Sequence, residues 1–162
     1  MEETRPPRRY VTGLDEDGRS CVVFREPENI YDEPLRALWT SDQAPASQEG
    51  NADRGGGPML AVPGGGSLLM AYTFLPSDVV QAPGMHATNT LDYVVIVEGS
   101  VTLHTETEEI VLHAGDVVVD RGIVHGWRNH TDKPCRGVTV VIDAQPLGAG
   151  ATIDEEGRPL AE

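Results

Sequence analysis

Apolar and polar residues alternate over short stretches along most of the chain, and turn residues separate these stretches. Between residues 67 and 143 the pattern predicts strands at 68–74, 86–97, 101–104, 109–112, 116–119, 125–128 and 138–142. Shorter strand-like runs lie nearer the N-terminus, at 9–12, 20–24 and 35–40. Short strands joined by turns, without a convincing helical period, favour an antiparallel sandwich or barrel.

The chain of 162 residues is of a length that suits one domain. Residues 43–66 are rich in Gly, Pro, Ala and Ser, which is typical of a loop. We therefore expect residues 1–66 to supply N-terminal strands and a loop that pack on a barrel formed by residues 67–143. Residues 144–162 are acidic and turn-like, and we expect a C-terminal tail there.

Charge and composition narrow the classes of partner. The formal net charge is −14, so phosphate backbones and anionic membrane surfaces are repelled, and we expect neither nucleic acid nor a membrane as a partner. No apolar run approaches the length of a membrane span, and the N-terminal residues lack the apolar core of a secretory signal. Two cysteines make no disulfide framework, which favours a cytoplasmic protein with free thiols.

All five histidines lie between residues 86 and 130. Strand alternation places His86, Thr88 and Asp92 on the same face as Val94 and Ile96, which is the inward face because these two residues are apolar. A carboxylate on that face is costly unless a positive or hydrogen-bonding group meets it.

The other candidate positions follow from the same alternation. His125 shares a face with Trp127, whereas His104 lies opposite Val101 and Leu103. We expect His113 and His130 at the surface, since both lie at turns.

The segment from His86 to Asn129 resembles the cupin superfamily of small antiparallel jelly-roll barrels. Its first motif here runs His86-Ala87-Thr88, three residues, Asp92, six residues and Gly99; its second begins at Gly115 and ends Gly122-Ile123-Val124-His125 and, after three residues, Asn129. An early Arg8-Arg9-Tyr10-Val11-Thr12-Gly13 segment is also similar to a subgroup of small bacterial and fungal cupins. The resemblance implies an all-β cupin barrel extended by N-terminal strands.

This chain departs from the family pattern at four positions. Thr88 replaces a metal histidine, Asp92 replaces a glutamate ligand, Val80 replaces a glycine and Asp120 replaces a proline. The resemblance therefore leaves His86, Asp92 and His125 as a 2-His-1-carboxylate set for Fe, Mn, Ni or Zn. The alternative is that the metal has been lost and the same three residues form a buried acid–base cluster.

The resulting functional hypothesis is a divalent-metal-dependent enzyme that acts on a small oxygenated organic molecule, with lyase, isomerase, cyclase or decarboxylase-type chemistry. Some relatives of this kind accompany biosynthetic enzymes, which suggests a biosynthetic pathway. His86, Asp92 and His125 are the predicted catalytic residues, and the predicted substrate-binding residues are Thr88, Trp127, Tyr72 and Phe74. A metal-free acid–base enzyme and a non-catalytic ligand-binding protein remain alternatives. Cupin relatives frequently dimerise, and uncovered sheet edges favour a homodimer here as well.

Overall fold

The computed structural model describes residues 6–56, 62, 64–77 and 84–146 of the chain. Every regular element in these ranges is a strand, as the sequence predicted, and they contain no helix long and apolar enough to cross a membrane. In chain order the strands are β1 (Tyr10–Leu14), β2 (Ser20–Arg25), β3 (Leu35–Ser41), β4 (Ser67–Phe74), β5 (Thr90–Glu98), β6 (Ser100–Thr105), β7 (Glu109–His113), β8 (Val117–Asp120), β9 (His125–Arg128) and β10 (Cys135–Asp143).

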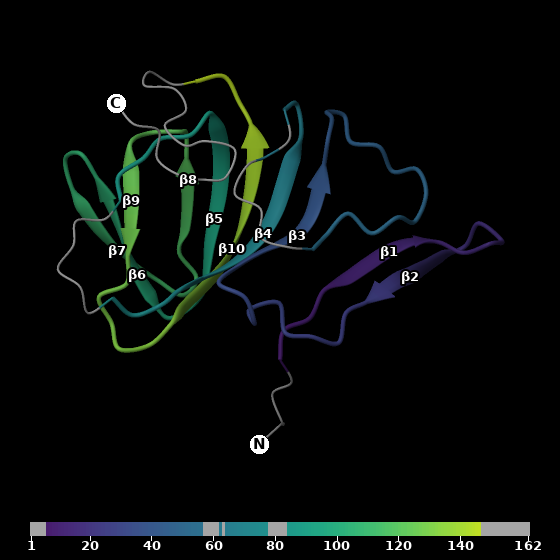
Figure 1. Cartoon of the computed structure of the whole chain (residues 1–162), viewed down its shortest axis with the longest axis horizontal. Helices are drawn as coiled ribbons and strands as arrows, with labels where there is room; N and C mark the ends of the chain where they lie inside the picture. The colour runs from purple at the N-terminus through teal and green to yellow at the C-terminus, as the bar shows by residue number, and fades with distance from the viewer. Residues whose placement is uncertain (1–5, 57–61, 63, 78–83, 147–162) are drawn as a thin grey trace.

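Two antiparallel sheets form the barrel (Figure 1). The larger has five strands in the order β3-β4-β10-β5-β8, and the smaller has three in the order β7-β6-β9. Neighbours such as β4 and β10, or β5 and β8, are distant in sequence, as a jelly roll requires. The predicted all-β cupin-type jelly roll is therefore confirmed.

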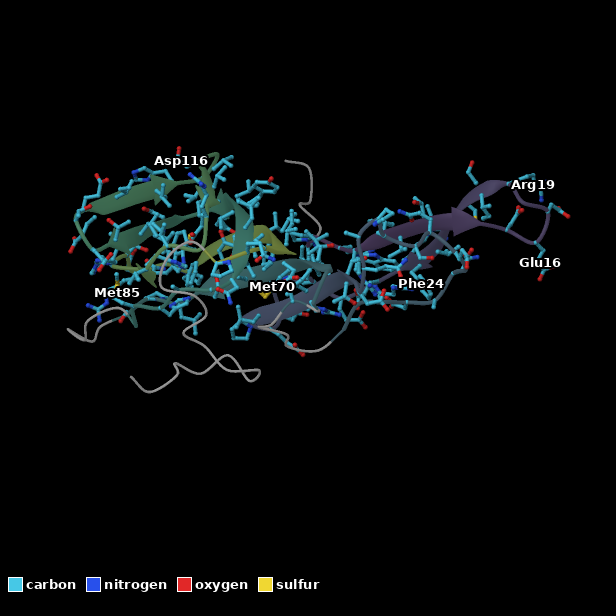
Figure 2. All side chains as sticks on the ribbon, turned by 90° about the horizontal axis from the view of Figure 1, so that it is seen from above. Glu16, Arg19, Phe24, Met70, Met85 and Asp116 are labelled. Atoms are coloured by element: carbon cyan, nitrogen blue, oxygen red, sulfur yellow. The ribbon has the colours of Figure 1, made fainter. Side chains whose placement is uncertain are left out.

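The N-terminal strands divide between two positions. Strand β3 joins the barrel as an edge strand beside β4, whereas β1 and β2 pair with each other in a separate hairpin. Figures 1 and 2 show this hairpin projecting away from the barrel, with Glu16 and Arg19 at its far end. Arg9 ties its base to the barrel, because the guanidinium bonds Glu26 at 2.8 Å, Asp53 at 2.6 Å and the Leu38 carbonyl at 2.9 Å.

The main core lies between the two barrel sheets. It joins Tyr72, Val94 and Ile96 of the larger sheet to Val101, Leu103 and Leu112 of the smaller one, with Cys135 beside them. Val94 and Ile96 thus face inward, as the sequence predicted.

Gly137 makes room for one of these core residues. The Tyr72 side chain crosses β10 directly above Gly137, where a Cβ would collide with the ring and with the Val95 carbonyl. The Tyr72 hydroxyl donates to that carbonyl at 3.2 Å. A glycine is therefore required here by close packing rather than by its backbone angles.

The outward face of the larger sheet is apolar and open to solvent over β5 and β8. Cross-strand pairs place Tyr93 opposite Val119 and Val95 opposite Val117. Tyr93 is 41% exposed, Val117 61% and Val119 57%. Tyr93 is thus on the face opposite Asp92, as strand alternation requires.

The largest difference from the predicted strand boundaries is at the start of β5. The sequence predicted a strand from His86 to Val97, but β5 begins at Thr90, and His86 forms only an isolated antiparallel bridge with His125. The alternation that placed Asp92 inward therefore does not extend back to His86 and Thr88, because these residues lie outside the ladder.

Candidate functional site

His125 and Asp120 form a buried pair at the end of the barrel where β8 passes into β9. The Nδ1 atom of His125 lies 2.9 Å from Asp120 Oδ2, and both side chains are almost fully buried. Burial alone lowers the pKa of His125, but the hydrogen bond and charge of Asp120 outweigh burial and raise it. For Asp120 burial alone raises the pKa, but His125 and backbone N–H groups lower it below its ordinary value.

A tight turn holds Asp120 in place. Its Oδ1 atom accepts from the backbone N–H groups of Gly122 at 2.9 Å and Ile123 at 3.3 Å, which leaves Oδ2 for His125. Gly122 has a φ of 74°, and a Cβ there would lie 2.5 Å from the Thr88 carbonyl oxygen. Glycine is thus needed both for the backbone angle and for the close approach of the Thr88 segment.

His86 is positioned beside His125 by backbone hydrogen bonds. The N–H of each residue donates to the carbonyl of the other at 2.9 Å, and the two ring centroids are 4.6 Å apart. His86 Nδ1 bonds the Gly84 carbonyl at 3.0 Å rather than a carboxylate. Burial therefore dominates and lowers the pKa of His86, so the ring favours its neutral form.

Asp92 faces the same interior from β5, in register with Asp120 on β8. Its Oδ1 atom is buried and has no hydrogen-bond partner. Burial raises the pKa of Asp92 to about 6, helped by the charge of Asp120 and opposed by a hydrogen bond from Thr90. An unpartnered buried carboxylate oxygen is unusual in a folded protein and marks a position that a ligand or water can satisfy.

The predicted substrate-binding residues divide into an aromatic group and Thr88. Tyr72 contacts Phe74 at a centroid distance of 4.9 Å, Phe74 stacks on Trp127 at 5.7 Å, and Trp127 meets the His125 ring edge-on at 5.9 Å. The aromatic rings therefore form a continuous series that ends at His125. The Thr88 hydroxyl instead pairs with Thr90 at 2.7 Å.

The remaining histidines lie apart from this cluster. His113 and His130 are exposed, as expected, and His130 meets the ring of His104 at 5.9 Å. His104 is buried and its Nδ1 lies 3.3 Å from Glu109. Its place on β6, opposite Leu103, is the one that alternation predicted.

The predicted metal ligands fit a metal in part. A histidine that ligates a metal through one ring nitrogen commonly donates its other ring N–H to a carbonyl or a carboxylate. In His86 and His125 the Nδ1 atom has such a partner, so Nε2 is the nitrogen that could ligate a metal. Asp92 adds an unpartnered buried oxygen. However, no three His, Cys, Asp or Glu side chains in the described part of the chain are placed to hold an ion together. The three-ligand set remains a prediction, and we derive no reaction step through it.

Asp120 was missed by sequence reasoning. It was noted only as the residue that stands where the family has proline, yet it is the direct partner of His125. The signal was an aspartate two residues before a glycine, a common pattern for a side chain that bonds its own turn. The sequence does not reveal which histidine that turn faces.

Known proteins resemble this chain over most of its length. Residues 71–141 match the family described as Cupin domain. A cupin-domain-containing oxidoreductase of Neurospora crassa, srdB, is 29% identical over 160 residues, which cover 88% of this chain and 76% of the relative. Oryzines biosynthesis cluster protein J of Aspergillus oryzae is 29% identical over 169 residues, covering 95% and 91%.

Solved structures show weaker similarity. A conserved protein of Klebsiella pneumoniae with a double-stranded β-helix domain has a TM-score of 0.42 at 25% identity, covering 48% of this chain and 68% of that protein. A Cupin 2 conserved barrel domain protein of Salinispora arenicola has a TM-score of 0.40 at 24% identity, covering 48% and 64%. The family match and the jelly-roll topology together identify residues 71–141 of this chain as a cupin domain.

Proposed function

We propose that this protein is a cupin enzyme that transfers a proton on a small oxygenated organic molecule, with His125 as the acid and His86 as the base. One observation carries the proposal. The centroids of two histidine rings lie 4.6 Å apart. Nδ1 of His125 faces the buried Asp120 carboxylate as well as the Ile123 carbonyl, whereas Nδ1 of His86 faces only the Gly84 carbonyl. Neighbouring groups whose surroundings favour opposite protonation states are suited to paired acid–base work.

His125 is the member of the pair that holds a proton. Asp120 accepts from Nδ1–H and stabilises the positive ring, so Nε2–H is free to donate to a substrate carbonyl oxygen. Donation to that oxygen stabilises the negative charge that develops when a neighbouring C–H bond is broken. The two backbone bonds to Asp120 keep the carboxylate oriented throughout.

His86 is the member that accepts a proton. Its Nδ1–H is directed to Gly84, so Nε2 carries the lone pair. The C–H bond next to the carbonyl breaks, its proton moves to His86 Nε2, and its electron pair forms the C=C bond of an enol as His125 protonates the oxygen. In an isomerisation, the proton on His86 moves to another carbon of a conjugated enol, and the enol O–H returns its proton to His125 as the carbonyl re-forms. In a lyase reaction, a group on the carbon β to the carbonyl leaves with the electron pair of its bond and takes the proton from His86, while the enol O–H returns its proton to His125.

The relatives support a place in small-molecule biosynthesis. Several are biosynthesis cluster proteins, and others are named cupin-domain-containing oxidoreductases. These names belong to the relatives, and we carry over only the coarse proposal that this chain acts on a biosynthetic intermediate.

Hydrogen–deuterium exchange tests the proposal without knowledge of the natural substrate. In D2O the protein should accelerate loss of the C–H signals next to the carbonyl of acetone, cyclohexanone or 2-tetralone, measured by proton NMR. His125→Gln and His86→Gln should each reduce the acceleration by about 100-fold or more. His113→Gln is the matched control, since His113 is an exposed histidine outside the site. Undiminished exchange in His125→Gln, or no exchange with any of the ketones, contradicts the proposal.

A second candidate keeps the predicted divalent ion, Fe, Mn, Ni or Zn, on Nε2 of His86 and His125 with Asp92 as the third ligand. The anchored Nδ1 atoms favour it. Such an ion polarises a carbonyl or carboxylate oxygen. Elemental analysis of the tag-free protein tests this candidate. Near-stoichiometric metal that is lost in both His86→Ala and Asp92→Ala supports it, and no metal after reconstitution contradicts it.

We also propose that the protein is a homodimer through the outward face of β5 and β8. A net charge of −14 makes copies of this chain repel one another, so association is favoured at a surface patch that carries no charge. An uncharged apolar patch of this kind is formed by Tyr93, Val95, Val117 and Val119. In a two-fold symmetric dimer the same patch of each copy packs against that of the other, and two apolar patches are compatible in this way.

A further inference from the structure

The inner face of the larger sheet carries a second buried polar atom without a partner, besides Asp92 Oδ1. This atom is the hydroxyl oxygen of Thr139 on β10. Thr139 is 5% exposed and lies in register with Val94 of β5 on one side and Met70 of β4 on the other. Its cross-strand neighbours therefore offer no side-chain hydrogen-bonding group.

Thr139 and Asp92 lie close together on this face. Asp92 pairs with Val141 and Val94 pairs with Thr139, so Asp92 and Thr139 are diagonal neighbours across β5 and β10. Diagonal positions on one face of a sheet are about 7–8 Å or less apart. The two unpartnered oxygens are therefore close enough for one small molecule to bond both.

Packing alone does not account for a hydroxyl at this position. Valine has the same shape as threonine and avoids the desolvation of a buried hydroxyl, so a purely structural position favours valine. The flanking residues of β10, Val138, Val140 and Val141, show that the strand accommodates valine readily. A buried hydroxyl without a partner is explained if a bound molecule supplies the partner.

The surroundings define the kind of molecule. Tyr72 is a further diagonal neighbour of Thr139, and it begins the series of rings that continues through Phe74 and Trp127 to His125. Aromatic rings favour a planar, ring-containing ligand. The inner-face positions of β4, β5, β8 and β10 include Asp92 and Asp120 but no Arg or Lys, so a negatively charged ligand is disfavoured.

We propose that the Thr139 hydroxyl is a specificity-determining contact that hydrogen-bonds a hydroxyl or carbonyl oxygen of an uncharged, planar, ring-containing substrate. The proposal deepens the proposed function and rests on it for the claim that the bound molecule is a substrate. Thr139 fixes one oxygen of the ring near Asp92, and the carbonyl that reacts is directed to His86 and His125.

Phenol and toluene test this contact, because they have nearly the same shape and differ in one hydroxyl group. We expect the wild-type protein to bind phenol about 3- to 10-fold more tightly than toluene, measured by titration calorimetry or NMR. Thr139→Val should remove most of this preference, and Thr139→Ser should restore it. Cyclohexanol, which lacks the aromatic ring, should bind less well than phenol.

Thr73→Val is the matched control. Thr73 also has a buried hydroxyl without a partner, but it lies on the outward-facing register of β4. The phenol preference should therefore survive Thr73→Val. A preference that survives Thr139→Val, or a wild-type protein that binds neither phenol nor toluene, overturns the inference.

Ketone exchange separates this inference from the proposed function. Thr73→Val should retain cyclohexanone exchange within a few-fold of the wild type, because Thr73 lies on the outward-facing register of β4. A phenol preference that depends on Thr139 in a protein without exchange activity contradicts the proposed function and leaves the contact in place. Exchange that depends on His86 and His125, with a phenol preference independent of Thr139, overturns only the inference drawn here.

Discussion

Asp92 and Asp120 are cross-strand partners, yet substitution by asparagine should change stability in opposite directions. Burial raises the pKa of Asp92 from 3.8 to about 6, so the folded protein holds this proton more tightly than the unfolded chain does. The stabilisation from Asp92 is present below pH 3.8 and is lost as the pH rises through about 6. Above that pH the wild type retains a buried, destabilising carboxylate.

The size of the effect follows from this shift. A change from 3.8 to about 6, at 1.36 kcal/mol per pKa unit, corresponds to about 3 kcal/mol. Asp92→Asn should therefore increase the free energy of unfolding by up to about 3 kcal/mol at pH 8 and leave it almost unchanged at pH 3. The value is an upper bound because the asparagine amide must also be accommodated.

Asp120→Asn gives the opposite result. The pKa of Asp120 is lowered, so its stabilisation is present above the unfolded pKa and is lost as the pH falls through the folded pKa. Replacing a charge-assisted bond to His125 by a neutral one should cost about 1–2 kcal/mol at pH 8.

Urea denaturation at pH 3, 5 and 8 measures all three proteins. Asp132→Asn serves as the control, since Asp132 is exposed in the segment between β9 and β10. If Asp92→Asn destabilises the protein at pH 8, or stabilises it equally at pH 3, the assignment of Asp92 as a desolvated carboxylate is wrong.

Three further predictions concern packing and assembly. Thr139→Val should raise the free energy of unfolding by about 1 kcal/mol, because it removes a buried hydroxyl without a partner. Thermal denaturation measures this gain, and a loss of stability contradicts the prediction. Gly137→Ala should lower the free energy of unfolding by about 1–3 kcal/mol in the same assay, since the new Cβ collides with Tyr72. An unchanged midpoint of thermal denaturation excludes that close contact. Tyr93→Asp should convert the dimer to a monomer in light scattering, whereas Asp132→Asn should not; a wild-type protein that is already monomeric refutes the interface.

The sequence predicted the barrel and supplied His86, Asp92 and His125 as candidate site residues, because strand alternation and motif spacing are local properties. Val94 and Ile96 face the core and Tyr93 faces outward, as their alternation requires. Alternation failed at His86 because the ladder of β5 begins only at Thr90. His86 is brought to the site instead by a bridge to His125, a long-range pairing that no local pattern encodes.

The roles of Asp120 and Thr139 could not be predicted from the sequence for the same reason. Asp120 becomes important because the turn at Gly122 directs its carboxylate to His125. Thr139 is conspicuous only when its neighbours across two strands are known to be Val94 and Met70. Both roles depend on register between distant strands, which the sequence does not reveal directly.

The pH dependence of ketone exchange tests the central claim most directly, because it reports the acid and the base together. We predict a bell-shaped profile that falls at low pH as His86 is protonated and at high pH as His125 loses its proton. In Asp120→Asn the alkaline limb should move to lower pH, since the group that raises the pKa of His125 has lost its charge. The acid limb should move less in the same direction, because the charge of Asp120 is the smallest of the causes that act on the pKa of His86. An alkaline limb that does not move would contradict the assignment of His125 and Asp120 as the acid pair.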